Sequence, residues 1–233
     1  MKIAVFAIPE ISAGKYNLKD SRLDEVDKLV KAKKKTYIQA ELVGEQDALQ
    51  ADAILVLSDA RADLILKDLD FVETRLTRAG DEGEKQLLNK LKAALEKEQF
   101  VNSLSFDEKE QQFLVTYGLF TNKAVIAAEK SDLEDLNNLL LRAMKEAGFI
   151  SFFTAGEKET RAWLIRKGET AWDASGAIHS DIQHGFIRAE IISFSDYIQA
   201  GGETGAKQAG KLRLEQKSYV MQDCDLATFR FNK

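Results

Sequence analysis

The sequence Phe153-Thr-Ala-Gly-Glu-Lys-Glu-Thr-Arg-Ala-Trp163 introduces the part of the chain in which short strands and turns replace longer helices. It leads into a strand expected from Thr160 to Arg166, and another strand is expected from Phe186 to Ser193. Further strand candidates near the end of the sequence would complete a small mixed sheet. We therefore expect a separate domain over residues 150–233, with its boundary near residue 149.

Four more motifs continue this domain: Ile178-His179-Ser-Asp181, Gly185-Phe-Ile-Arg-Ala-Glu190, Gly210-Lys-Leu-Arg-Leu-Glu215 and Phe229-Arg-Phe-Asn232. Together with Phe153–Trp163, these motifs closely resemble, almost residue by residue, the TGS domain of the YchF (Obg-like) family of P-loop GTPases. The resemblance covers essentially all of residues 150–233. It implies an α+β, ubiquitin-like β-grasp fold, which in this family accompanies a nucleotide-binding domain and is associated with RNA or ribosome contact.

Residues 1–149 show the alternation of strands and helices that is typical of a parallel α/β sheet. Three early strands are expected: Ile3–Ile8, Tyr37–Val43 and Ala53–Leu57. Asp20 or Ser21 is the candidate cap of a helix between the first two. This part resembles the nucleotide-binding domain of the same family more faintly, so we expect a degenerate, P-loop-NTPase-like α/β domain.

A helical arm is expected at about residues 60–100, inserted in the α/β domain. Apolar residues recur there at alternating spacings of three and four, which is the pattern of a coiled-coil seam. Gly80-Asp81-Glu82-Gly83 interrupts the seam, so the two helices should form an antiparallel hairpin. Charged hairpins of this kind usually serve as structural arms or as protein-partner surfaces, and we expect no catalytic group on it.

The family's phosphate-binding loop would correspond to Ala7–Tyr16, where this sequence departs from the motif. A P-loop needs backbone N–H groups around the phosphates, a Lys, and a small hydroxyl for Mg²⁺. Gly14 and Lys15 resemble a relic of that loop, but Tyr16 cannot supply the small hydroxyl. Glu10 would also place a carboxylate close to the phosphates, which is electrostatically unfavourable.

Two other nucleotide motifs of the family are altered as well. The Mg²⁺-sensing Asp-x-x-Gly has become Glu41-Leu-Val-Gly44, and the base-binding signal reads Ala128-Glu129-Lys130-Ser131 without its Asn. Phosphoryl transfer depends on positioning and electrostatics, so these defects together predict a pseudo-GTPase without catalytic residues. Gly14, Lys15 and Gly44 remain as a residual nucleotide site. We expect no cofactor, and ATP or GTP with Mg²⁺ only if the relic still binds.

Basic residues of the second domain are the candidates for RNA or ribosome contact: Arg188, Lys207, Lys211, Arg213 and Lys217. They could form a one-sided patch for phosphates even though this domain is neutral. Scattered solvating charges are an equally good interpretation.

Few other residues suggest chemistry. His179 and Asp181 could form an acid/base pair, but local capping is the simpler interpretation. Cys224 stands between two aspartates where the family usually has a glycine, and as the only cysteine it cannot form an internal disulfide. With only two histidines, we expect no metal site.

The composition bounds the function further. The chain has 233 residues, a net charge of −5, no apolar stretch of membrane-spanning length and no recognisable signal peptide, so we expect a cytoplasmic protein without membrane contact. Two functions remain open. One is a non-hydrolytic, RNA- or ribosome-associated regulatory or adaptor module that acts through the TGS domain. The alternative is a residual ATP- or GTP-binding protein with slow NTPase activity.

Overall fold

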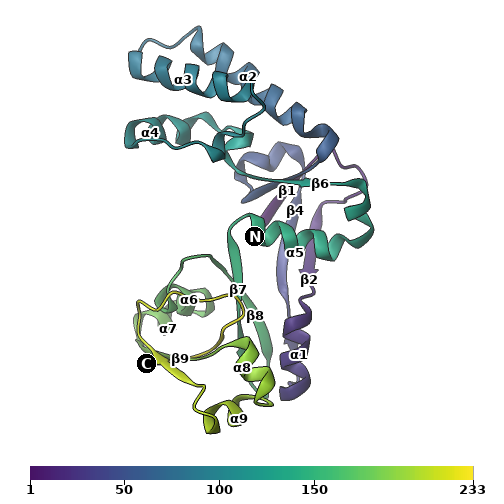
Figure 1. Ribbon diagram of the computed structural model, residues 1–233, viewed down its shortest axis with the longest axis vertical. Helices are drawn as coiled ribbons and strands as arrows, with labels where there is room; N and C mark the ends of the chain where they lie inside the picture. The colour runs from purple at the N-terminus through teal and green to yellow at the C-terminus, as the bar shows by residue number, and fades with distance from the viewer. Residues whose placement is uncertain (233) are drawn as a thin grey trace. The chain divides into compact units, whose positions relative to one another are not determined.

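The computed structural model describes residues 1–232 (Figure 1). The chain divides into two compact units, which are described separately below. The first unit contains Met1–Tyr16 and Ala40–Ala147, and the second contains Asn17–Gln39 and the chain from Gly148 onward. Residues 17–39, which the sequence places in the N-terminal domain, fall in the second unit in this division.

The first unit is built on a five-stranded sheet with the order β2-β4-β1-β5-β6. Its strands are β1 (Lys2–Phe6), β2 (Gly14–Leu18), β4 (Ile38–Val43), β5 (Ala53–Leu57) and β6 (Ala124–Ala128). Within this order, the adjacent strands β4, β1, β5 and β6 are parallel to one another. All five residues of β5, Ala-Ile-Leu-Val-Leu, are buried, as expected for a central strand covered on both faces.

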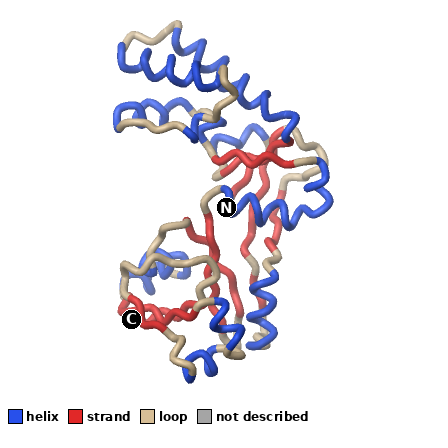
Figure 2. Tube along the Cα trace, viewed as in Figure 1, coloured by secondary structure: helices blue, strands red, loops and turns tan. Residues whose placement is uncertain are grey.

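Helices flank this sheet and extend beyond it (Figure 2). They are α2 (Arg61–Leu76), α3 (Glu82–Leu95), α4 (Glu108–Tyr117) and α5 (Leu136–Glu146). The packed helices α2 and α3 are joined by a short turn, and α4 packs against α3. Asp81 caps α3 by accepting from the backbone of Glu84, and Gly118 ends α4 with φ +61°, where a residue with a side chain would be strained.

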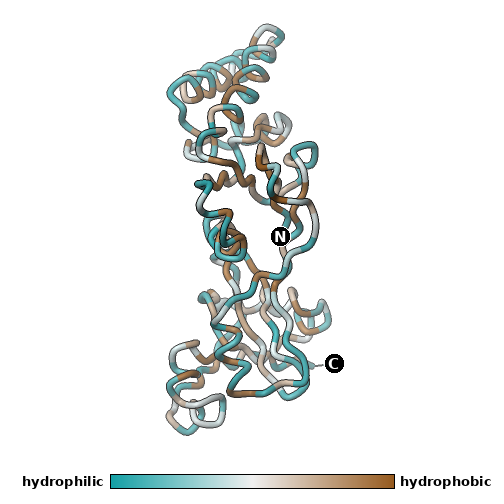
Figure 3. The backbone as a smooth tube through the Cα atoms, turned by 90° about the vertical axis from the view of Figure 1, so that its right-hand side faces the viewer, coloured by the Kyte–Doolittle hydropathy of each residue, from teal (hydrophilic) through white to brown (hydrophobic). Residues whose placement is uncertain are grey.

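The helices α2, α3 and α4 share an apolar core of their own. Its buried members include Val72, Leu87, Leu88, Leu91, Leu95 and Leu114. In Figure 3, these helices lie at the top and carry both hydrophobic and hydrophilic residues around their turns. This is the amphipathic pattern of helices that bury one face and solvate the other.

The second unit contains a mixed sheet with the order β10-β9-β11-β7-β8-β3. Its strands are β3 (Lys35–Thr36), β7 (Phe149–Ala155), β8 (Thr160–Arg166), β9 (Phe186–Ile192), β10 (Arg213–Glu215) and β11 (Leu226–Phe231). β9 is antiparallel to both β10 and β11, and β7 is antiparallel to β8. The pairs β11/β7 and β3/β8 are parallel, so the sheet is mixed, as the sequence predicts.

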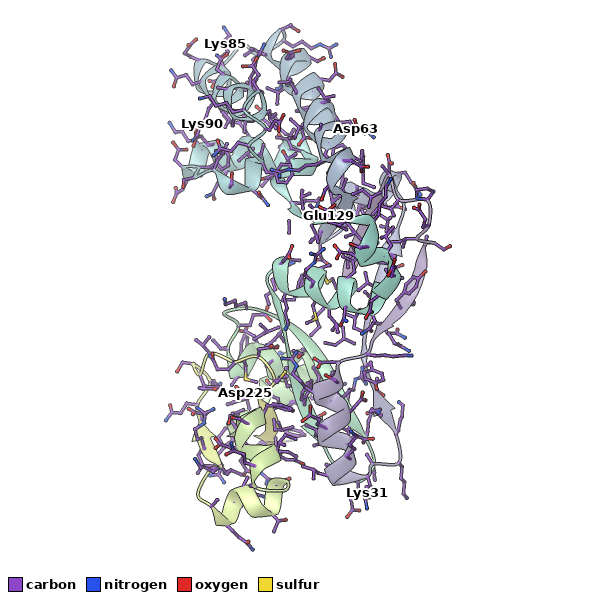
Figure 4. The ribbon with its side chains drawn as sticks, turned by 45° about the vertical axis from the view of Figure 1, so that its right-hand side comes forward. Lys31, Asp63, Lys85, Lys90, Glu129 and Asp225 are labelled. Carbon is purple, nitrogen blue, oxygen red and sulfur yellow. The ribbon has the colours of Figure 1, made fainter. Side chains whose placement is uncertain are left out.

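Five helices belong to the second unit: α1 (Ser21–Val30), α6 (Ala171–Ile178), α7 (Ser180–His184), α8 (Phe194–Gln199) and α9 (Glu203–Gln208). The helix α6 packs on β8 and β9 over a core that includes Phe152 and Phe229. The helix α1 contacts β7, β8 and α8, and its Leu23 and Val26 are fully buried. Lys31, labelled in Figure 4, ends α1 in a left-handed conformation.

Candidate functional site

The carboxyl ends of the parallel strands β4, β1, β5 and β6 lie at one edge of the first sheet. The strand order reverses between β1 and β5, and open α/β sheets bind their ligands at such a reversal. The residues that follow these strands are Ala7, Gly44, Ser58 and Glu129. This edge is therefore the candidate ligand site of the first unit.

A backbone N–H, an ammonium group and a carboxylate meet at this edge. Ala7 has φ +54° and donates its N–H to Oε1 of Glu45 over 3.2 Å. Lys67 of α2 donates from Nζ to Oε2 of the same carboxylate over 3.1 Å, and its Nζ lies 4.6 Å from the ring centroid of Phe6. An N–H beside an ammonium group is a binding position for an anion. Here the carboxylate of Glu45 occupies that position.

The groups at the ends of β5 and β6 also bind one another. Ser58 donates from Oγ to Oε1 of Glu129 over 2.7 Å. Glu129, labelled in Figure 4, caps a short 3-10 helix in which its own backbone N–H donates to Asp132. The family's base-binding Asn would fall in this segment, but the side chain present is an acceptor that is already bonded locally.

Gly14 and Lys15, the expected relic of the phosphate loop, do not lie in a loop that opens a helix. Both residues lie in strand β2 and are exposed, and Gly14 has φ +153°. In a P-loop, the Gly-Lys pair opens a helix so that the helical N–H groups point at the phosphates. The next helix, α1, begins at Ser21 and is capped by Asp20.

Gly44, the third residue of the residual nucleotide site, directly precedes Glu45. It is the N-cap of the 3-10 helix η1 (Glu45–Gln50). Its place at the end of β4 brings the Glu45 carboxylate to the N–H of Ala7. Sequence analysis missed Glu45 and Lys67. Glu45 could have been suspected, because it follows the altered Asp-x-x-Gly motif directly, whereas the position of Lys67 depends on the packing of α2.

The five basic candidates of the second unit do not lie on one face of the sheet. Arg213 lies directly opposite Ile191, so it shares the face of Ala189 and Ile191. Arg188 follows the opposite face, because neighbouring strand residues alternate. Arg188 and Lys217 line the same open groove of about 560 Å³, beside the exposed Leu214.

Most of these cations already have acidic partners. Lys207 pairs with Glu203 at 2.5 Å, Lys211 with Asp196 at 3.1 Å, and Arg213 with Glu215 at 3.3 Å. The Arg188 guanidinium lies 3.9 Å from Glu190, whose pKa is lowered mainly by hydrogen bonds from Arg230. Within residues 1–232, Lys217 is the one of the five for which no ion pair is found.

The remaining candidates make structural contacts. His179 caps α7 by accepting from the N–H of Asp181 at Nδ1, which is the local capping that the sequence favours. Burial raises the pKa of Cys224 to about 12, so its thiol is not an activated nucleophile. Asp225, labelled in Figure 4, is buried and accepts from the Tyr219 hydroxyl over 2.8 Å.

No group of three or more His, Cys, Asp or Glu side chains in residues 1–232 is placed to hold a metal ion. None of the helices in this part of the chain is long and apolar enough to cross a membrane.

The architecture is a mixed α/β fold with two sheets. The structure of the Schizosaccharomyces pombe YchF GTPase is similar, with a TM-score of 0.76 over 99% of this chain and 97% of that one, at 18% identity. Residues 149–232 match the family model YchF-GTPase_C, which is described as a "Protein of unknown function (DUF933)".

A relative of which this chain covers two thirds establishes the family, and a second relative agrees with it. The ribosome-binding ATPase YchF of Bacillus subtilis is 31% identical over 78% of this chain and 68% of its own length. The protein of the same name from Haemophilus influenzae is 32% identical over 73% of this chain and 64% of its own length. The chain belongs to the YchF family, although it spans only about two thirds of the length of these relatives.

Proposed function

We propose that this chain is a non-hydrolytic member of the YchF family, a pseudo-GTPase that acts as an RNA- or ribosome-associated adaptor. In this proposal, the second unit is a TGS domain of the β-grasp type and makes the contact. The relatives from B. subtilis and H. influenzae are named ribosome-binding ATPases, which supports a ribosomal partner. The mixed sheet with α6 packed on one face is in keeping with a β-grasp fold.

The observation that carries the proposal is the Glu45 carboxylate at the N–H of Ala7. A nucleotide phosphate at this position would have to displace Glu45 from both Ala7 and Lys67. Leaving the carboxylate nearby would place like charges together, which is electrostatically unfavourable. The Gly-Lys pair that would compensate in a P-loop lies instead in strand β2. Nucleotide binding and turnover are therefore disfavoured together.

Calorimetric titration of the whole chain with ATP and GTP, with and without Mg²⁺, tests this part of the proposal. We expect no heat of binding at about 1 mM nucleotide, which corresponds to an affinity weaker than about 4 kcal/mol. Micromolar binding that Lys67→Ala abolishes and Lys15→Ala leaves intact would favour the residual nucleotide-binding protein instead. Glu45→Gln removes the carboxylate charge, so a gain of phosphate binding in this variant would support the blocking role of Glu45.

The ribosomal part of the proposal rests on the groove that contains Arg188 and Lys217. Both cations are exposed at one edge of the second sheet, and Lys217 can meet a phosphate without first leaving an acidic partner. The other candidates, Lys207, Lys211 and Arg213, would have to exchange a carboxylate for a phosphate. We therefore place the main contact at Arg188 and Lys217.

Co-sedimentation with purified ribosomes tests this contact. The double variant Arg188→Ala/Lys217→Ala should reduce the bound fraction at least fivefold at about 0.1 M salt, with less difference at high salt. Lys85→Ala, which removes a cation of α3 outside this groove, is the matched control. Equal sedimentation of the double variant and the wild type would contradict the assignment of these residues.

The helices α2 and α3 form the second proposed surface. They pack along each other as expected for a short coiled-coil arm, and they carry no group of the candidate nucleotide site apart from Lys67. In this proposal the arm contacts a protein partner, while the second unit contacts RNA or the ribosome.

A further inference from the structure

A groove on the arm is lined by side chains of α2, α4 and the turn that follows α2. It has a volume of about 380 Å³. Its lining consists of aromatic, hydroxyl and guanidinium groups: Phe71, Thr74, Arg75, Arg78, Thr116 and Tyr117. The candidate nucleotide site described above uses none of these side chains.

Two aromatic rings, those of Phe71 and Tyr117, line the groove. The ring centroid of Phe71 lies 5.6 Å from that of Tyr117, and the ring of Phe113 stacks on the other side at 6.3 Å. Tyr117 is buried, but 37% of Phe71 is exposed. A large apolar side chain of a ligand could therefore pack on the exposed part of Phe71. Its binding would remove from water the apolar surface of Phe71 that the arm does not cover.

The two guanidinium groups that line the groove differ in whether they bind an acidic partner. Arg75 donates from Nε to the buried carboxylate of Glu84 over 2.7 Å, and Tyr117 donates its hydroxyl to the same oxygen over 2.9 Å. Arg78 follows the end of α2 and is exposed, and no acidic partner is found for it among residues 1–232. None of the residues that line the groove is acidic.

The charge of the whole arm distinguishes between possible ligands. Residues 61–117 contain nine Lys and Arg against twelve Asp and Glu, a net charge of −3. A nucleic-acid backbone, with a phosphate at every residue, would be repelled by this excess of acidic groups. A single carboxylate at Arg78 would be attracted by the guanidinium next to it. It would be repelled by the acidic residues of the arm much less than a chain of phosphates would be.

We propose that the groove between α2 and α4 binds a protein partner through a short peptide segment in which a large apolar or aromatic side chain neighbours a carboxylate. The apolar side chain packs on Phe71, and the carboxylate binds the guanidinium of Arg78. Thr74 offers its hydroxyl group to the peptide backbone between these two contacts. The Thr116 hydroxyl donates to the carbonyl oxygen of Phe113 over 2.7 Å, so it offers an acceptor. The proposal rests on the assignment of a protein partner to the arm, and it is independent of the ribosomal contact.

Nuclear magnetic resonance titration of the full chain tests the proposal. The probe is the acetylated, amidated tetrapeptide Glu-Phe-Leu-Glu, and Gln-Phe-Leu-Gln is the uncharged control. We expect the amide resonances of Phe71, Arg78 and Thr116 to shift with a dissociation constant of about 1 mM or below. The control peptide should bind at least fivefold more weakly, because it lacks the charge-assisted hydrogen bond.

Arg78→Ala should weaken binding of the acidic peptide at least fivefold and leave binding of the control peptide unchanged. Arg78 is exposed and lies outside α2, so this variant should retain the fold, which circular dichroism checks. The matched control is Lys85→Ala on α3, at a position labelled in Figure 4. It should bind both peptides as the wild type does.

Several results would overturn the proposal. One is the absence of shifts at Phe71, Arg78 and Thr116 up to 10 mM peptide, roughly ten times the expected dissociation constant. Another is equal affinity of wild type and Arg78→Ala for the acidic peptide. A third is tighter binding of a twelve-nucleotide oligouridylate at the same resonances, which would assign the groove to RNA. Ribosome co-sedimentation of Arg78→Ala should stay normal, so failure of this proposal is distinguishable from failure of the ribosomal one.

Discussion

Arg22 of α1 donates from Nη1 to Oδ2 of Asp223 over 2.7 Å, although the two residues are 201 positions apart in the sequence. The same guanidinium binds the carboxylate of Asp20, and Asp223 also accepts from the backbone N–H of Ser151 over 3.1 Å. Arg22 thus connects the start of α1 with the segments around β7 and before β11. This connection explains why residues 17–39 belong to the second unit.

Arg22→Ala should destabilise the second unit by about 1–2 kcal/mol, because both aspartates lose a charge-assisted hydrogen bond in a partly buried environment. Urea denaturation monitored by tryptophan fluorescence measures the change, since Trp163 and Trp172 both lie in this unit. Lys28→Ala, at an exposed position of the same helix, should change stability by less than about 0.5 kcal/mol. Equal effects of the two variants would show that the Arg22 contacts contribute little.

The second unit should also fail to fold stably without residues 17–39. Leu23 and Val26 of α1 are buried in it, and a fragment that starts at residue 148 would expose the apolar surface that they cover. Each such side chain contributes about 1.5–3 kcal/mol when buried. We expect the fragment 148–233 to give a poorly dispersed amide spectrum. Adding a peptide of residues 17–39 should restore dispersion, and a well-dispersed spectrum of the fragment alone would contradict this.

Several features of the fold could be predicted from local sequence. The apolar run Ala53–Leu57 predicts a buried strand, and it forms β5 with the same bounds. Asp20 was one of two candidate caps for the first helix and is the residue that caps it. Gly148 follows the Ala147 cap of α5 and has φ +79°, a conformation that favours glycine. Each of these features depends on residues that are neighbours in the sequence, so it can be predicted without knowledge of the tertiary contacts.

Other features depend on contacts between distant parts of the chain. Gly14-Lys15 has the composition of a phosphate loop, but its residues form strand β2 at the edge of the first sheet. The groups at the candidate site, Ala7, Glu45 and Lys67, come from three segments, and only the fold brings them together. The sequence resemblance therefore predicts the family and the general fold, whereas the contents of the site require the structure.

The stability of the arm should depend on pH through the carboxyl group of Glu84. Hydrogen bonds from Arg75 lower the pKa of this buried carboxyl below its ordinary value of 4.5, against the opposing effect of burial. A lowered folded-state pKa contributes stability that is present above about pH 4.5 and is lost as the pH falls through the folded-state pKa. The wild type should therefore be more stable than Glu84→Gln at pH 7, and the difference should shrink in acid.

Urea denaturation of both proteins at a series of pH values between 7 and 3 checks this. We expect a difference of about 1–2 kcal/mol at neutral pH, the usual contribution of a hydrogen bond to a charged group. Glu82→Gln, an exposed residue in the same turn of α3, is the control and should show little difference at any pH. A stability difference between wild type and Glu84→Gln that does not change with pH would rule out the ion pair as its cause.

Cys224 should be unreactive in the folded protein. Its side chain is 2% exposed, and burial raises its pKa to about 12, so almost no thiolate is present at pH 8. Alkylation requires the thiolate, and we expect iodoacetamide to modify the native chain at least 100-fold more slowly than the urea-unfolded chain. Rapid modification of the native protein would show that the segment around Cys224 opens readily.

The backbone at Cys224 allows a sharper test of strain. Its φ of +66° lies in the left-handed region, and the resemblance to the family places a glycine at this position. At an ordinary site, Ala is favoured over Gly by about 0.5–1 kcal/mol, whereas a left-handed conformation costs a residue with a Cβ about 1–2 kcal/mol. Both Cys224→Ala and Cys224→Gly remove the buried thiol. Their comparison therefore isolates the backbone contribution. We expect Cys224→Gly to be more stable than Cys224→Ala by about 0.5–1 kcal/mol in urea denaturation. The reverse order would mean that the turn relaxes out of the left-handed region when the thiol is removed.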